Sequence, residues 1–352
     1  MKTKFNLLWW GRFDPYYARN GVLRDLMRKL DIEIHDFQPH LCGVADIEAA
    51  LQRLPKADAV WVPCFRQRDM AAARRWCNRN NVTLIFDPLI SAYDKQVFER
   101  FKIKADSSVA QTLLERERRI FNMADHVITD TACHAEFFQK TMGVPKDRCS
   151  TIYVGAEEDM FRSEPKSSPS NPLQILFYGS YIPLHGTQTI IAAARSYNGP
   201  PIRWCMLGSG PARAECEAAA AGLKNVRFEP HIPYNKLPQR IHQADILLGI
   251  FGKSAKAGRV MPNKLFQSLA SGRPVITRSS LAYPKPLQSS QALNFIEPGN
   301  PHALADAVSN WATTPERLRD RGSEAGKIYQ KHLSSTIIKE QIKEALSLGV
   351  RG

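Results

Sequence analysis

The sequence predicts an α/β protein with two doubly wound parallel sheets, and three observations support this fold class. The chain has 352 residues, more than the roughly 250–300 at which a single hydrophobic core stops growing. In both halves, short apolar runs rich in β-branched and aromatic residues alternate with longer stretches of helical periodicity. Between the halves, residues 163–171 contain no apolar side chain except two prolines. We therefore expect two domains, each with about six strands separated by helices.

The expected strands follow the same alternation in each half. They cover residues 5–10, 32–37, 58–64, 82–87, 126–130 and 150–154 in the first half, and 173–178, 202–207, 225–228, 245–251, 274–277 and 293–297 in the second. The predicted domains are an N-terminal domain at 1–162, a hinge linker at 163–172, a C-terminal domain at 173–328 and a helical segment at 329–352 that can pack back against the first domain. If two such domains face a central cleft, the carboxyl ends of both sheets border it, and ligands bind there in doubly wound folds.

The composition is that of a soluble globular protein. Hydrophobic residues make up 43% of the chain, and no apolar run has the roughly 18 residues of a membrane span. The apolar patch near the N-terminus is shorter than a signal-peptide core. Seven cysteines are scattered without a C-x-x-C pair, so we expect neither disulfides nor a metal site. The expected location is the cytoplasm.

The positive charge lies mainly in the second half. The net charge is +14; residues 1–162 hold 25 basic and 22 acidic side chains, whereas residues 163–352 hold 23 and 12. Such an excess attracts a nucleotide phosphate, a lipid headgroup or a nucleic acid. Because the chain has no nucleic-acid motif and no basic stripe interleaved with aromatic residues, nucleic acid is not expected as a partner.

Glycines follow two expected strands of the second half. Gly179 and Gly186 bracket a turn between the strand at 173–178 and the helix after it, and Gly208 and Gly210 follow the strand at 202–207. Backbone N–H groups at such a helix start favour a phosphate. The alternative is that these glycines only allow tight turns.

A basic loop follows the strand at 245–251. Lys253, Lys256, Arg259 and Lys264 lie within 12 residues. Pro262 and Gly272 predict a helix from about Pro262 to Ser271. Lys264 then sits in its first turn, where the helix dipole disfavours a cation. A bound diphosphate would cancel this penalty; the alternative is a solvated surface lysine.

Several stretches together resemble glycosyltransferase family 4, also called glycosyl transferases group 1. They are GRVMPNKLFQSLASGRPVIT (258–277), LFYGSYIPLHG (176–186), FIEPGNPHALADAV (295–308) and the segments 126–161 and 226–251. The resemblance covers residues 120–310 well and the first 120 residues more loosely. It implies two Rossmann-like domains of the GT-B fold. It also implies retaining transfer of a sugar from a nucleoside diphosphate sugar to an acceptor hydroxyl, without a metal or other cofactor.

In this family the second domain binds the donor and the first binds the acceptor. Carried over to this chain, the resemblance implies that Lys264 holds the diphosphate and that Gly179 and Gly186 shape the phosphate loop. The expected acceptor is a glycan or lipid-linked glycan of the cell envelope or of a surface polysaccharide. Two alternatives remain open: a non-catalytic binding protein and an epimerase-like enzyme of the same fold.

The chain departs from the family pattern at four positions. Arg259 and Gln267 replace the two acids of Glu-x7-Glu, and Ser180 and His185 replace the usual Arg and Lys of the phosphate loop. We expect Gln267 to bind the ribose and Arg259 to join Lys264 at the diphosphate, since a guanidinium suits phosphate oxygens. An anionic donor sugar is a second explanation. The predicted donor contacts also include Lys253, Asn263, Gly208 and Gly210.

Polar side chains also follow two strands of the first half. Asp87, Ser91, Tyr93 and Asp94 come after the strand at 82–87, and Gly11, Arg12 and Asp14 come after the first strand. A carboxylate there could orient the acceptor hydroxyl or stabilise positive charge on the sugar. Asp87 before a proline can equally be a turn former, and Asp94 a helix cap.

Two basic segments of the first half could contact a membrane. The helix expected at 20–30 carries apolar residues on one side and Arg24, Arg28 and Lys29 elsewhere, and residues 73–80 add basic groups near Trp76. Such helices can lie on anionic lipid at the inner face of the membrane. The alternative is that they pack on the sheet of their own domain.

Overall fold

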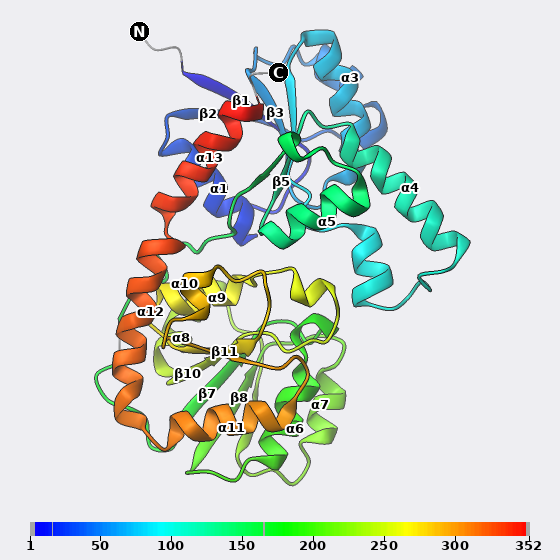
Figure 1. Cartoon of the computed structure of the whole chain (residues 1–352). Helices are drawn as coiled ribbons and strands as arrows, with labels where there is room; N and C mark the ends of the chain where they lie inside the picture. The colour runs from blue at the N-terminus through cyan, green and yellow to red at the C-terminus, as the bar shows by residue number, and fades with distance from the viewer. Residues whose placement is uncertain (1–3, 16, 165, 350–352) are drawn as a thin grey trace. The chain divides into compact units, whose positions relative to one another are not determined.

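The computed structural model describes residues 4–15, 17–164 and 166–349 (Figure 1). The chain forms two compact units: unit 1 comprises Met1–Gly155 and Ser335–Gly352, and unit 2 comprises Ala156–Ser334. The chain therefore leaves unit 1 after Gly155 and re-enters it after Ser334. The ends of the predicted domains, residues 1–3 and 350–352, lie outside the described residues.

Unit 1 is built on a parallel sheet of six strands in the order β2-β1-β3-β4-β5-β6. The strands are β1 (Phe5–Trp10), β2 (Ile32–Phe37), β3 (Ala59–Val62), β4 (Thr83–Phe86), β5 (His126–Thr129) and β6 (Cys149–Thr151). The pairing continues from strand to strand across the sheet. For example, Leu7 of β1 pairs with Ile34 of β2 and with Ala59 of β3. The order reverses between β1 and β3, so the loops after these two strands border the switch point where ligands bind in doubly wound folds.

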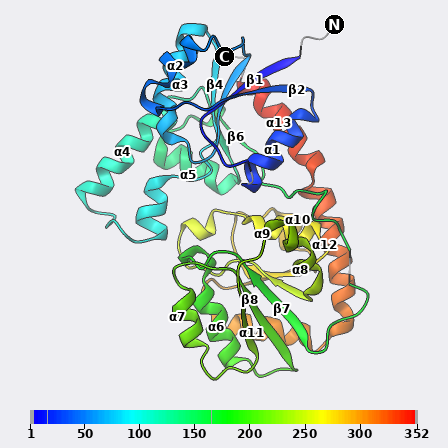
Figure 2. The same cartoon turned by 180° about the vertical axis from the view of Figure 1, so that it is seen from behind.

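Helices cover both faces of this sheet. They are α1 (Ala18–Arg28), α2 (Ala45–Leu51), α3 (Met70–Asn80), α4 (Ser108–Asn122), α5 (Ala132–Met142) and α13 (Ser335–Gly349), with 3-10 turns η1 (Cys42–Val44), η2 (Gln67–Asp69) and η4 (Lys146–Arg148) and the π-helix η3 (Asp94–Glu99). One core lies under α3, α4 and α5, and a second lies under α1 and α13. Figures 1 and 2 show α13 beside α1, and Figure 2 shows α2 beside α3.

Unit 2 repeats this layout with the strand order β12-β11-β10-β7-β8-β9. The strands are β7 (Leu173–Tyr178), β8 (Ile202–Leu207), β9 (Val226–Glu229), β10 (Ile246–Leu248), β11 (Val275–Arg278) and β12 (Leu293–Ile296). The helices are α6 (Thr187–Ser196), α7 (Arg213–Ala219), α8 (Leu237–Gln243), α9 (Asn263–Ala270), α10 (Lys285–Gln288), α11 (Pro301–Ala312) and α12 (Leu318–His332), with 3-10 turns η5 (Pro183–His185), η6 (Tyr234–Lys236), η7 (Lys256–Gly258) and η8 (Pro315–Arg317). Here the switch point lies between β7 and β10.

The structure confirms the predicted fold class, because all six strands of each sheet are parallel and alternate with helices. Some strand ends differ from the expected ones. The strand expected at 245–251 is β10, which ends at Leu248, although the backbone of Gly249 and of Ile250 still forms hydrogen bonds with Ile276 and Arg278 of β11. The edge strand expected at 150–154 is β6, which pairs only with β5.

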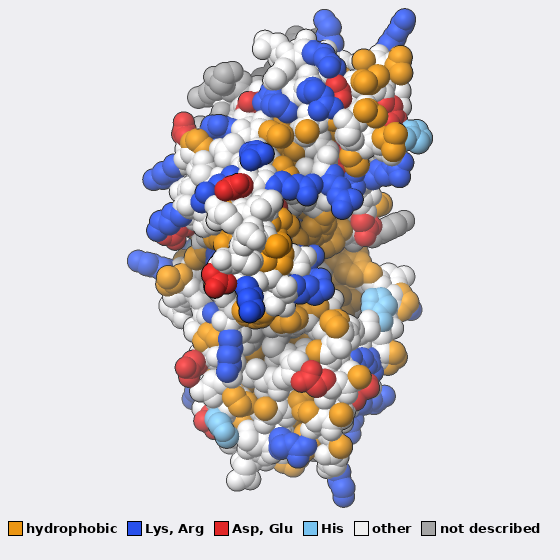
Figure 3. Space-filling view, turned by 90° about the vertical axis from the view of Figure 1, so that its right-hand side faces the viewer, with side chains coloured by type: hydrophobic (Ala, Val, Ile, Leu, Met, Phe, Trp, Pro, Cys, Tyr) orange, Lys and Arg blue, Asp and Glu red, His pale blue; other side chains and the backbone are white. Residues whose placement is uncertain are grey.

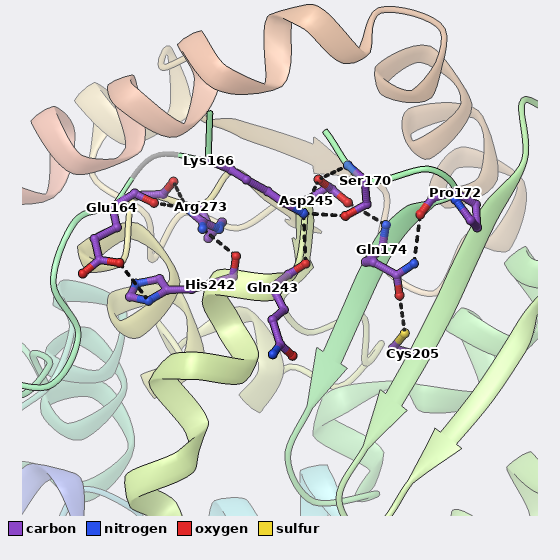
Figure 4. A network of polar contacts seen from close by, with 11 residues as sticks. Glu164, Lys166, Ser170, Pro172, Gln174, Cys205, His242, Gln243, Asp245 and Arg273 are labelled. Carbon is purple, nitrogen blue, oxygen red and sulfur yellow. Dashed lines mark hydrogen bonds and ion pairs between the residues drawn. The ribbon is translucent and has the colours of Figure 1, made fainter. Parts of the chain in front are cut away.

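The segment predicted as a hinge linker is fixed on unit 2 (Figure 4). The carboxylate of Asp245 accepts hydrogen bonds from Lys166 Nζ at 2.9 Å and from the backbone N–H of Ser170 at 3.0 Å. Arg273 donates to the carbonyl of Glu164 at 2.6 Å. The segment is polar because its groups bond to buried Asp245 and Arg273, a reason that composition alone does not reveal.

Of the two alternatives for the helices at 20–30 and 73–80, the structure favours packing on the sheet of unit 1. In α1, Val22, Leu23 and Leu26 are buried, and Arg24 pairs with Asp36 at 2.6 Å. Trp76 of α3 is buried as well. Both helices use their apolar faces for the core of unit 1, so these faces are not available to lipid. None of the helices in the described part of the chain is long and apolar enough to cross a membrane.

Candidate functional site

The loops after β7 and β10 pack tightly against each other at the switch point of unit 2. The backbone N–H of Phe251 donates to the carbonyl of His185 at 3.0 Å, and that of Gly252 donates to the carbonyl of Leu184 at 3.2 Å. Gly186, with φ +62°, is the N-cap residue directly before α6, and a Cβ there would lie 2.6 Å from the backbone of Phe251. Glycine at 186 is thus required by both its backbone angle and its packing.

Gly179, Gly208 and Gly210 allow the loops after β7 and β8 to approach each other. All three have positive φ. A Cβ on Gly208 would overlap the carbonyl oxygen of Gly179, and one on Gly210 would lie 2.4 Å from the backbone N of Tyr181. This packing explains Gly208 and Gly210 without a ligand. Their direct contact with a donor stays a prediction.

Lys264 occupies the first turn of α9 and is buried, with 6% of its surface exposed. Its Nζ has no hydrogen-bond partner among the described residues and lies 4.1 Å from the centre of the Phe177 ring. A Cβ on Gly179 would lie 3.3 Å from this amine, so the loop after β7 passes directly beside it. Burial holds the pKa of Lys264 well below its ordinary value. The ammonium form is therefore destabilised, and an anion bound at this loop would stabilise it.

The local sequence explains the position of Lys264. Pro262 sets the start of α9, and the apolar face of α9 sets the orientation of the helix. Pro262 has extended backbone and ends the loop, so that α9 begins at Asn263, one residue later than predicted. Asn263 is half-buried at the helix start. The helix buries Leu265, Phe266 and Leu269, and this apolar face fixes the rotation that directs Lys264 toward Phe177.

His185 and Ser180 adopt a geometry that differs from their predicted role. His185 Nδ1 donates to the carbonyl of exposed Ser180, which fixes the proton on Nδ1. Burial and the neighbouring Lys264 amine lower the pKa of His185 to about 3. The neutral ring then presents a lone pair at Nε2, which repels a phosphate oxygen. His185 is better explained as the side chain that holds the loop after β7 in shape.

Gln267 is already bonded on both sides of its amide. Its Oε1 accepts from Tyr178 at 3.1 Å, and its Nε2 donates to the Tyr234 hydroxyl at 2.9 Å. Tyr234 in turn donates to Glu157 at 2.9 Å, and burial raises the pKa of this carboxyl. The expected ribose contact of Gln267 would require these bonds to exchange. This network could not be predicted from the sequence, because its members are far apart along the chain.

The remaining cations of the basic loop differ in exposure. Lys256 is buried in η7, Arg259 follows it and is half-buried, and Lys253 is exposed with its stem against Gly299. Arg278, which sequence analysis missed, donates from Nη1 to the carbonyl of Gly252 at 2.6 Å. Its position at the end of β11 was the only available signal. Arg278 thus holds the start of the loop that carries the predicted donor contacts.

In unit 1, Asp87 is part of a buried ion pair. It is 0% exposed, and both of its oxygens accept from Arg19 Nε, at 2.9 and 2.8 Å. Arg19 also donates to the carbonyl of Ile152. This corrects the interpretation of Asp87 as a free carboxylate at the acceptor, because its oxygens face the interior of unit 1.

Glu117 of α4 organises the loop that holds the other predicted acceptor residues. Its buried carboxylate accepts from Ser91 Oγ at 2.5 Å and from the backbone N–H of Tyr93 at 2.9 Å. Ser91 in turn accepts from the N–H of Asp94, which is buried in the first turn of η3. Ser91, rather than Asp94, therefore acts as the cap. Neither Ser91 nor Asp94 is exposed, so their predicted contact with substrate is not favoured by this geometry.

The loop after β1 places its predicted residues differently. Gly11 has φ +123°, and a Cβ there would lie 3.1 Å from Arg66, so this glycine serves close packing against the loop after β3. Arg12 donates to the carbonyl of Pro39 at 3.0 Å and is exposed, as is Asp14. Arg12 and Asp14 remain candidates for substrate contact.

These features define the class of protein. Two doubly wound units with glycine loops and a buried cation at a switch point are the architecture of the GT-B fold. Residues 159–328 match the family described as Glycosyl transferases group 1. This confirms the resemblance found in the sequence.

Three known proteins illustrate the similarity. A 125-residue stretch is 32% identical to the putative colanic acid biosynthesis glycosyl transferase WcaI of Escherichia coli, covering 35% of this chain and 30% of that protein, so the match spans under a third of that relative's length. Anabaena Alr3699/HepE, solved in complex with UDP, has a TM-score of 0.70 at 15% identity over 97% of this chain and 99% of its own. Sucrose-phosphate synthase of Thermosynechococcus elongatus has a TM-score of 0.74 at 16% identity over 97% and 98%. At these identities the two structures show a shared fold.

Proposed function

We propose that this protein is a glycosyltransferase that moves a sugar from a nucleoside diphosphate sugar to an acceptor hydroxyl with retention at the anomeric carbon. The observation that carries the proposal is the buried Lys264 amine, which lies beside the loop after β7 without a hydrogen-bond partner in the described part of the chain. A diphosphate at this loop would supply the missing partner. The match of residues 159–328 to the family described as Glycosyl transferases group 1 supports the same proposal.

The donor is a nucleotide sugar that unit 2 binds. HepE was solved with UDP and with UDP-glucose, which supports a nucleoside diphosphate in the same fold. The match to WcaI supports a role in making a surface or cell-envelope polysaccharide. The acceptor is a glycan or lipid-linked glycan, and the protein acts in the cytoplasm or at the inner face of the membrane.

The residues of unit 2 would act mainly through charge. Lys264, protonated when the diphosphate is bound, stabilises the negative charge that grows on the leaving group. Arg259 adds a second cation, and Gly179 lets the backbone approach the phosphate oxygens. The departing phosphate helps to remove the proton of the acceptor hydroxyl. We expect no metal or other cofactor, because these cations supply the charge that a metal would otherwise provide.

A thermal-shift panel of UDP-, GDP-, ADP- and dTDP-sugars tests donor binding. At a hundredfold excess over its Kd, a true donor should add about 2.7 kcal/mol of stability. Lys264→Ala should abolish the shift for every donor, whereas Lys224→Ala, a change of an exposed lysine of unit 2, should keep it. If no nucleotide shifts the melting temperature of the unmodified protein, the proposal is wrong.

A second experiment separates transfer from mere binding. The donor identified by the panel is incubated with candidate acceptors, and NMR reports the anomeric configuration of the product. An α-linked product from an α-linked donor supports retention, and inversion contradicts it. Donor binding without any sugar transfer would favour the non-catalytic alternative, for which the occupied amide of Gln267 is the supporting observation.

A further inference from the structure

A cavity of about 340 Å³ opens in unit 1 outside the residues discussed so far as candidate acceptor contacts. It lies between the loop after β3, the loop after β4 with η3, and α4. The residues that line it and carry the following argument are Phe65, Arg66, Arg68, Lys95, Leu113 and Arg116. Because β3 and β4 are parallel neighbours, their carboxyl ends bring these two loops together at one edge of the sheet.

The lining is strongly basic. Its four cations, Arg66, Arg68, Lys95 and Arg116, face a single lining carboxylate, Glu117, whose oxygen is bonded to the loop after β4. Arg66 is fixed by Asp69 at 2.6 Å. Arg68 and Arg116 are exposed and form no ion pair within the described ranges. Figure 3 shows the side of unit 1 that carries α4, with Lys and Arg side chains around patches of hydrophobic ones.

The same cavity has an apolar portion. Phe65, Ile90, Leu113 and Ile120 line it, and Phe65 is 46% exposed although it is a large aromatic side chain. Apolar and cationic groups therefore face one space. A ligand that fits both has an anionic group next to an apolar or sugar-ring surface.

The backbone around the cavity is strained. Phe65 has φ +66° and Leu89 has φ +56°, a conformation that non-glycine residues rarely adopt. Lys95 lies in η3, a π-helix, which is rare and frequently found at functional sites. Such features persist where the surrounding structure imposes them, and they cluster at ligand sites. They are independent of the charge argument and point to the same place.

We propose that this cavity binds the phosphate of a phosphorylated acceptor. Arg68 and Arg116 contact the phosphate, and Phe65 and Leu113 contact the apolar or sugar-ring surface next to it. The identification of this ligand as the sugar acceptor rests on the proposed transferase function, whereas the phosphate site itself does not. Guanidinium forks match phosphate oxygens in pairs, which favours a phosphate over a neutral glycan. The phosphate comes from either an isoprenoid diphosphate lipid or a soluble sugar phosphate.

Calorimetric titration of the full chain with farnesyl diphosphate and with glucose 1-phosphate tests the site. We expect at least one probe to bind, and Arg116→Ala and Arg68→Ala each to weaken that probe about tenfold or more. Arg119→Ala is the matched control, because Arg119 is an exposed arginine of the same helix that does not line the cavity. It should leave binding within about twofold. Tighter binding of farnesyl diphosphate identifies a lipid source, and tighter binding of glucose 1-phosphate identifies a soluble one.

The proposal is overturned if neither probe binds at millimolar concentration, or if Arg116→Ala and Arg68→Ala behave like Arg119→Ala. The latter result would mean that a probe binds elsewhere, for example at Lys264. The nucleotide-sugar panel is run on the same variants to keep the two proposals apart. In these two variants, weakened phosphate binding with a retained nucleotide shift supports the cavity as a separate phosphate site. A nucleotide shift without any phosphate binding by the unmodified protein rejects the cavity alone, and a missing nucleotide shift in the unmodified protein rejects the transferase function alone.

Discussion

Replacing Lys264 by Met should stabilise the protein while removing nucleotide binding. The amine is buried with 6% of its surface exposed and lacks a hydrogen-bond partner among the described residues. A buried polar group left without a partner costs about 1–3 kcal/mol. A cation–π contact with the Phe177 ring, whose centre lies 4.1 Å from Nζ, offsets part of this free-energy cost. Burial also lowers the pKa of Lys264, because desolvation destabilises the ammonium form.

Methionine keeps the volume and flexibility of the lysine stem and has no charge to desolvate. We therefore expect Lys264→Met to raise the free energy of unfolding by about 1–3 kcal/mol at pH 7. For a unit of this size, each kcal/mol corresponds to a rise in Tm of about 2–4 °C. Stability and function would then oppose each other at this residue, as they often do at active sites.

Calorimetry of the unmodified protein, Lys264→Met and Lys224→Met measures this effect. Lys224 is exposed in unit 2, and its replacement should change the free energy of unfolding by no more than about 0.5 kcal/mol. A Lys264→Met variant that is less stable than the unmodified protein would refute the reasoning about its desolvation. A variant that still responds to UDP would refute the role of Lys264 at the diphosphate.

Three further predictions concern the other buried polar groups. Asp87→Ala should lower the free energy of unfolding in urea by about 3–5 kcal/mol, because it leaves buried Arg19 unpaired. The control Asp25→Ala breaks an exposed pair and should lower it by under about 1 kcal/mol. Equal losses would contradict the assignment of Asp87 to a buried ion pair. Glu117→Gln should cost about 1–3 kcal/mol by weakening two bonds to the loop after β4, and an unchanged urea midpoint would argue against that anchoring. The pKa of His185 is lowered to about 3, below the roughly 6.5 of an unfolded histidine, so the folded state binds fewer protons between these values and stability rises with pH across that window. His185→Gln should reduce the difference in the free energy of unfolding between pH 4 and pH 7. If this difference is the same in the variant and in the unmodified protein, the role assigned to His185 is wrong.

The sequence predicted the elements well because each strand and helix is encoded locally. The alternation of apolar runs with amphipathic stretches located both six-stranded sheets, and Pro262 located the start of α9 to within one residue. Lys264 could be singled out for the same reason, since the helix dipole makes a cation in a first turn unusual. The glycine turns after β7 and β8 were equally visible as pairs of residues after a strand.

The partners of polar side chains could not be predicted, because they come from distant parts of the chain. Asp87 meets Arg19 across 68 residues, and Gln267 is linked to Glu157 through Tyr234. A single sequence contains no signal for such pairings. The segment at 163–172 shows the same limit, since its polar composition suits a solvated linker as well as a strap bonded to Asp245.

The last helix of unit 1 has a consequence for how the protein forms in the cell. Ile338, Ile342 and Ala345 of α13 are buried in the core under α1, together with Val22 and Leu23. The ribosome synthesises all of unit 2 before it reaches these residues. The core of unit 1 under α1 therefore remains incomplete, with part of its apolar surface exposed, until synthesis has passed residue 334. Nascent chains of this protein are expected to engage chaperones through that uncovered surface, and unit 2 is expected to be the first part to reach its native state.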